Sequence, residues 1–137
     1  MNCYFIIFYF FINHYINVAL WVMQTILAFG FVFGGLNKIV QPKEKLAEKF
    51  RWFWVNDFSA GAVKLIGVAE VAGGIGIVLP TLLNIAPLLT PIAGISLAIL
   101  MLGALVVHLR RKENSEAVAP LVLVFVFLSI AYGRFTY

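Results

Sequence analysis

The chain has 137 residues, of which 63% are hydrophobic and 12% are charged, and its formal net charge is +4. Soluble domains use about 45–50% apolar and about 25% charged residues, so this composition excludes a soluble globular protein. The basic residues cluster beside apolar runs of membrane-spanning length, which favours membrane-flanking positions over nucleic-acid binding. The single cysteine, Cys3, cannot form an intramolecular disulfide, and this excludes a dithiol redox relay within the chain.

Residues 1–17 are apolar and aromatic but are interrupted by Asn13, His14 and Asn17. Their apolar run of about ten residues is too short to span a membrane. A basic n-region and an Ala-x-Ala cleavage site are both missing, which argues against a signal peptide. We therefore expect an N-terminal extension that either continues the first helix or reflects a mis-assigned start. Residues 18–137 are expected to form one membrane domain.

The first predicted span covers residues 18–38, about 31 Å at 1.5 Å per residue. Pro42 then breaks the helix, and a charged connector begins. Within residues 43–57, apolar side chains recur at helical spacing among charged ones: Leu46, Phe50, Phe53 and Trp54. This pattern predicts a short amphipathic helix in the headgroup plane, with Trp52 and Trp54 as membrane-interface anchors.

Three further spans are predicted at residues 60–79, 88–109 and 118–132. Pro80 is expected to end the second span, and a basic cluster ends the third: Arg110, Arg111 and Lys112. Such a cluster is typical of a membrane interface. The predicted fold is therefore an all-α bundle of four transmembrane helices, with a short interfacial amphipathic helix between the first and the second.

The distribution of basic residues predicts the orientation of the bundle. Nine of the ten Lys and Arg residues lie at the end shared by the two polar connectors, residues 39–63 and 110–117, and only Arg134 lies at the other end. Cytoplasmic loops carry the excess of Lys and Arg in membrane proteins. We expect both connectors to be cytoplasmic and both termini to lie outside, in a multi-pass protein of the cell membrane.

Four polar side chains should meet in the cytoplasmic half of the bundle: Asn37, Lys38, Glu70 and His108. A charge at membrane depth costs about 2.5–3.5 kcal/mol on insertion scales, so Glu70 needs a partner. Lys64 is rotated by roughly 240° from Glu70 on the same helix, which leaves Lys38 as the expected counter-ion. The pair either pins two helices together or forms a proton or ligand site beside a hydrophobic pocket.

Glycines on the spans predict close helix packing at four positions: Gly34, Gly35, Gly67 and Gly74. Gly67, Glu70 and Gly74 share one helix face, which allows a neighbouring helix to approach and supply the cation.

The residues themselves leave the cofactor unknown; a quinone enters only with the family resemblance described below. Haem is disfavoured, because His14 and His108 are predicted at opposite membrane faces and two axial imidazoles need the same depth. No Cys, His or Asp cluster has metal-ligand spacing, so no metal site is expected.

With these residues laid out, the chain resembles the DoxX-like family of small four-helix membrane proteins over residues 18–135. The resemblance rests on segments 33–38, 64–70, 101–104 and 131–135, together with Pro80 and His108. The family takes its name from a subunit of a thiosulfate:quinone oxidoreductase, and relatives are linked to redox or thiol-stress responses and to membrane-protein assembly.

The resemblance implies an accessory membrane subunit in redox, quinone-linked or stress-response processes, without independent catalytic activity. One alternative is a non-enzymatic assembly or interaction factor for membrane proteins, and a third is a small-molecule transporter that works as an oligomer. The expected partners are the lipid bilayer and either a membrane protein or a second copy of the chain. Nucleic acid is not expected.

Overall fold

The computed structural model describes residues 3–49 and 51–137. Met1, Asn2 and Phe50, the last of which belongs to the predicted amphipathic pattern, lie outside the described residues. The described part is helical and contains no strand. Its elements are α1 (Cys3–Val40), α2 (Lys43–Ala47), η1 (Phe53–Asp57), α3 (Ala60–Gly76), α4 (Leu79–Leu82), α5 (Leu89–Arg110) and α6 (Asn114–Thr136).

Four helical stretches are long and apolar enough to cross a membrane: Cys3–Val40, Ala60–Leu82, Leu89–Arg110 and Asn114–Thr136. They confirm the predicted all-α fold with four spans. The first helix is continuous from Cys3, so the N-terminal extension joins it through Asn13, His14 and Asn17 without a break. The second stretch is interrupted after Gly76, earlier than Pro80, which sits in the first turn of α4 where a missing N–H is tolerated.

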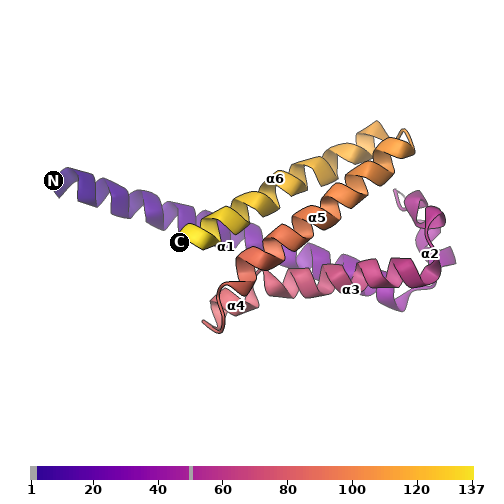
Figure 1. Cartoon of the computed structure of the whole chain (residues 1–137), viewed down its shortest axis with the longest axis horizontal. Coiled ribbons are helices and arrows are strands. Elements are labelled where there is room, and N and C mark those ends of the chain that lie inside the picture. Colours follow the sequence, from indigo (N-terminus) through magenta and orange to yellow (C-terminus); the bar gives the residue numbers. More distant parts are fainter. Residues whose placement is uncertain (1–2, 50) are drawn as a thin grey trace.

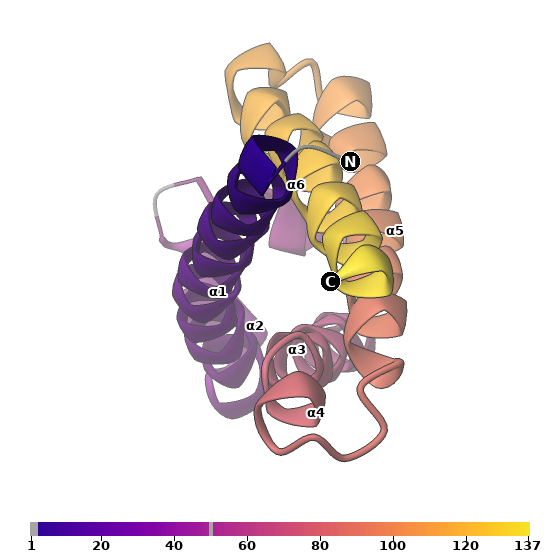
Figure 2. The ribbon, with the colours of Figure 1, turned by 90° about the vertical axis from the view of Figure 1, so that its left-hand side faces the viewer.

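The long helices form two antiparallel pairs, α1 with α3 and α5 with α6. Figure 1 shows the pairs close together near α4 and diverging toward the end that carries α2, and Figure 2 shows α1 opposite α5 and α6. The main core lies where the pairs meet and consists of Leu20, Ile77, Leu97, Ala98, Met101, Val124, Phe127 and Ile130. The end at which the pairs diverge, which carries α2, is called here the connector end.

Two glycines set the distance between α1 and α3. A β-carbon on Gly35 would lie 2.5 Å from the carbonyl oxygen of Gly67, and one on Gly67 would lie 2.7 Å from that of Gly35. Gly74 is also crowded, because a β-carbon there would lie 3.0 Å from Val32. Gly34 does not share this role, since a β-carbon there would meet only the Lys38 and Glu70 side chains at 3.9 Å.

The connector between α1 and α3 forms two short helical pieces, α2 and η1, where the sequence predicted one amphipathic helix. Arg51 has a φ of 70°, a left-handed conformation that ends a helix, and it separates the two pieces. Leu46 of α2 and Val55 of η1 are fully buried with Val63 of α3 in a second, smaller core. This core folds the connector back onto the bundle.

Candidate functional site

The predicted ion pair lies between α1 and α3 near the connector end. Lys38 Nζ is 2.6 Å from Glu70 Oε2, and the two side chains are only 8% and 9% exposed. The pair forms because the Gly35–Gly67 crossing, three residues along each helix, brings the two backbones together. Each charge is thereby compensated within the apolar part of the bundle.

The pair borders a cavity of about 560 Å³ between the two helix pairs. Aromatic rings of the connector and apolar side chains of α3, α5 and α6 form most of its lining: Trp52, Trp54, Phe58, Ile66, Leu100, Met101, Gly103, Ala104, Val107, Pro120 and Leu123, with Lys38, Glu70, His108 and Arg110 as the charged or polar members. This volume lies within the range of about 300–1,000 Å³ that is usual for small-molecule sites.

Trp52 and Trp54, predicted as interface anchors, both line this cavity. Lys38 Nζ lies 4.5 Å from the centre of the Trp52 ring, a cation–π contact beside the ion pair. Both indoles also pack against the small core of Leu46, Val55 and Val63, which holds them beside the bundle.

The structure brings three of the four predicted polar residues to the cavity and leaves the fourth aside. His108 lines the cavity, but its Nδ1 lies 2.8 Å from Glu113 Oε2 and is not bonded to the ion pair. Asn37 turns away from Lys38, as neighbouring helix residues do. It donates to the carbonyl of Phe33, and its oxygen accepts from Gln41 and Lys49.

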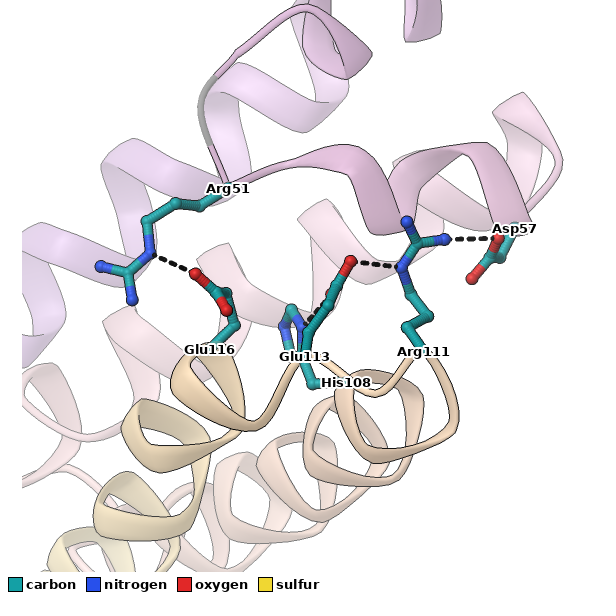
Figure 3. A network of polar contacts seen from close by, with 6 residues as sticks. All are labelled: Arg51, Asp57, His108, Arg111, Glu113 and Glu116. Carbon is teal, nitrogen blue, oxygen red and sulfur yellow. Dashed lines mark hydrogen bonds and ion pairs between the residues drawn. The ribbon is translucent and has the colours of Figure 1, made fainter.

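A set of ion pairs, called here the connector clasp, joins the two connectors (Figure 3). Arg111 donates from Nη1 to Asp57 and from Nε to Glu113, both at 2.8 Å. A longer contact of 3.4 Å joins Arg51 to Glu116. These contacts tie η1 to the turn between α5 and α6, so the two indoles are held over the cavity.

The clasp also shifts the acidity of its members. Hydrogen bonds from Arg111 and His108 lower the pKa of Glu113, and the carboxylates of Asp57 and Glu113 raise the pKa of Arg111. Arg111, predicted at the membrane interface, is therefore engaged in ion pairs. Its neighbours Arg110 and Lys112 are exposed.

Sequence reasoning missed a second polar network at the opposite end. Gln24 of α1 is fully buried and donates to the carbonyl of Ile77, while its oxygen accepts from Arg134 Nε at 2.6 Å. Arg134 also donates to Asn17 at 2.8 Å and lies 4.5 Å from the Trp21 ring. Two amides seven residues apart in an apolar helix were the available signal, because buried amides need partners.

Comparison with models of protein families identifies the family to which the chain belongs. The model of the DoxX-like family matches residues 22–131, most of the chain. The chain belongs to the DoxX-like family. The resemblance predicted from the sequence is thus confirmed, and four membrane-spanning helices make this DoxX-like protein a multi-pass integral membrane protein.

The DoxX-like match includes Lys38, Glu70 and His108 and leaves out Asn17 and Arg134. The cavity therefore lies within the family domain, whereas the network at the opposite end reaches beyond it. Neither the comparison with curated proteins nor that with solved structures finds a match.

Proposed function

We propose that this DoxX-like protein is an accessory membrane subunit that binds a neutral amphiphile of the quinone class in the cavity beside Lys38 and Glu70. The observation that carries the proposal is that the ion pair borders a cavity of about 560 Å³. Protein interiors are close-packed, so a pair that only joins two helices has no use for such a space.

The chemistry of the pair favours a head group without net charge. An ammonium has three protons, of which Lys38 gives one to Glu70 Oε2. Among the described residues, no hydrogen bond reaches the second carboxylate oxygen of Glu70. The pair thus offers a donor and an acceptor while its charges cancel, which suits the carbonyl and hydroxyl groups of a quinone or quinol. The indoles of Trp52 and Trp54 provide flat apolar walls for a ring.

Two glycine positions supply a matched experiment. A β-carbon on Gly103, which lines the cavity, or on Gly61, which does not, would meet nothing within 4 Å. Protein purified in mild detergent is extracted, and the bound amphiphiles are identified by mass spectrometry and absorption. We expect the wild type and Gly61→Leu to retain the same compound and Gly103→Leu to lose it. Absence of a bound amphiphile, or equal retention by all three, contradicts the proposal.

The orientation inferred from the basic residues completes the proposal. The contact between Asp57 and Arg111 supports one shared end for the two connectors, and nine of the ten Lys and Arg residues belong to that end. With the connectors in the cytoplasm, the cavity lies in the inner leaflet, where a membrane-dissolved quinone has access.

A second candidate function, an assembly or interaction factor, is favoured by the N-terminal part of α1. The described residues 3–12 are exposed on all sides, and Figure 1 shows this part of α1 projecting beyond the rest of the bundle. Cys3, the single cysteine, is exposed there and can carry a chemical probe. A photo-crosslinker on Cys3 in native membranes is expected to give a discrete adduct, with another membrane protein or with a second copy. Crosslinks to lipid alone contradict this function.

A further inference from the structure

A second, smaller cavity lies on the other side of the ion pair's side chains and shares the pair with the first cavity. It measures about 290 Å³ and is lined by Ile26, Leu27, Gly30, Phe31, Gly34, Lys38, Glu70 and Leu123. Lys38, Glu70 and Leu123 line both cavities, so both spaces border the ion pair. Apart from the pair itself, every side chain that lines the smaller cavity is apolar.

The smaller cavity forms a groove along one side of α1. Lys38, Gly34, Gly30 and Ile26 follow one another at intervals of four residues, which places them on one helix face. Twelve residues correspond to about 18 Å, more than half of the apolar thickness of a bilayer. Gly30 is exposed and Ile26 is 66% exposed, so the groove opens toward the lipid. We call it the α1 groove.

We propose that the α1 groove receives the hydrocarbon chain of the amphiphile whose head occupies the larger cavity, an inference that rests on the proposed function. At about 290 Å³ the groove is smaller than the sites that hold whole ligands, but it suits a single chain. The ligand is therefore a single-chain amphiphile that lies along α1. Its polar head is at the connector end and its chain points toward the middle of the membrane.

The groove lets the hydrocarbon chain leave the larger cavity, and it adds little to the affinity of the protein for the ligand. Lipid tails are as apolar as leucine, so a chain gains little free energy when it moves from the bilayer into an apolar groove. Short-chain and long-chain ligands should therefore bind the wild type about equally at the same concentration in the membrane phase. Blocking the groove should weaken only the long-chain ligand, because its chain has no other space to occupy.

Tryptophan fluorescence can report binding at the head site. The chain has three tryptophans, and a Trp21→Phe background leaves only Trp52 and Trp54, both at the larger cavity. Ethyl- and decyl-substituted benzoquinones quench indole fluorescence and serve as the short and long probes. Saturable quenching by each is measured in detergent micelles at matched micellar concentrations.

Gly30→Leu blocks the groove, because a side chain at Gly30 has open space and lines only the smaller cavity. We expect this variant to bind the decyl probe at least about tenfold more weakly and the ethyl probe as the wild type does. Gly61→Leu, the same exchange away from both cavities, should bind both probes normally. Normal binding of the decyl probe by Gly30→Leu would overturn the groove alone. If neither probe quenches the Trp21→Phe parent protein saturably, the proposed function is overturned, and the groove with it.

A second measurement needs no substitution and guards against a misfolded Gly30→Leu variant. A decyl benzoquinone with a diazirine at the end of its chain is bound to the wild type and irradiated, and the labelled residues are mapped by mass spectrometry. Labels should gather on residues 26–31 of α1. Labels concentrated on α3 or α5 would show that the chain leaves the cavity by another route and would overturn the proposal.

Discussion

Lys38 Nζ on α1 and Glu70 Oε2 on α3 lie 2.6 Å apart, with both side chains almost completely buried. The contact closes just beside the crossing of Gly35 and Gly67, where the two helix backbones are nearest. Two roles follow from this position. The pair holds the α1–α3 unit together, and its free hydrogen-bonding capacity faces the cavity.

The first prediction concerns stability. Lys38→Met and Glu70→Gln should each destabilise the bundle by about 3–5 kcal/mol, because each leaves one buried group without its partner. The double variant should lose less than the sum of the single losses. Unfolding in a graded denaturing detergent measures the cycle. Additive losses would mean that the two residues do not interact.

The second prediction separates the two roles of the pair. The Lys38→Met, Glu70→Gln double variant removes both charges, so it should fold yet fail to retain the amphiphile. Folding is measured by circular dichroism, and retention by mass spectrometry of the extracted lipid. If the double variant both folds and retains the wild-type amphiphile, the pair serves only to hold α1 and α3 together.

The third prediction concerns the helix crossing. Gly67→Ala should destabilise the bundle by about 1–3 kcal/mol, because the new methyl group would meet the backbone oxygen of Gly35 at 2.7 Å. Gly103→Ala and Gly61→Ala introduce the same methyl group into open space and serve as controls. Both controls should match or exceed the wild type in thermal unfolding, since alanine favours helix over glycine by about 1 kcal/mol. Equal stability of all three variants would contradict the close crossing.

The fourth prediction is a pH dependence of the connector clasp. Contacts with Arg111 and His108 hold the pKa of Glu113 below its ordinary value of 4.5. Its contribution to stability is therefore complete above about pH 4.5 and lost as the pH falls through the lower, folded-state pKa. Glu113→Gln should be less stable than the wild type at pH 7, by about 0.2–1 kcal/mol as for partly exposed pairs.

The two proteins should converge in thermal stability well below pH 4.5. Glu44→Gln, at an exposed position in α2, is the matched control and should follow the wild type throughout. A gap between Glu113→Gln and the wild type that persists unchanged into acid would show that the carboxylate charge is not what holds the clasp.

The fifth prediction is the topology. Single cysteines at the Lys45 and Glu113 positions, in a Cys3→Ser background, should be shielded from an impermeant thiol reagent in intact cells. Native Cys3, at the other end of α1, should react from outside and provides the positive control. Labelling of either connector position from outside would reverse the orientation.

The spans and the ion pair could be predicted from the sequence because each follows from a simple physical requirement. An acid inside an apolar span needs a partner, and Lys38 is the cation that the neighbouring helix offers at that depth. The same logic did not separate Lys38 from Asn37, because a small error in helix phase exchanges two adjacent positions. Nor does helical periodicity reveal that Trp52 and Trp54 line the cavity, because the connector is divided into two short helical pieces.

A hydrophobic pocket beside the pair was one of two readings of the sequence, but the size of the cavity and the presence of the α1 groove were beyond sequence reasoning. Both exist because two tightly packed helix pairs diverge, and that angle results from contacts made far away in the main core. Arg134 could be counted as a lone cation, but its bonds to Gln24 and Asn17 join residues more than a hundred positions apart. Local patterns carry no information about such distant pairings.

The length of α1 has a consequence for the surrounding lipid. Its 38 residues extend about 57 Å at 1.5 Å per residue, almost twice the hydrocarbon thickness of about 30 Å, whereas α5 and α6, with 22 and 23 residues, match that thickness. This excess is the N-terminal part of α1, in which Asn13, His14 and Asn17 follow an apolar run too short to span a membrane. With Cys3 accessible from outside, as predicted above, the excess lies beyond the hydrocarbon layer, and the exposed aromatic side chains of residues 4–11 meet the lipid headgroups there.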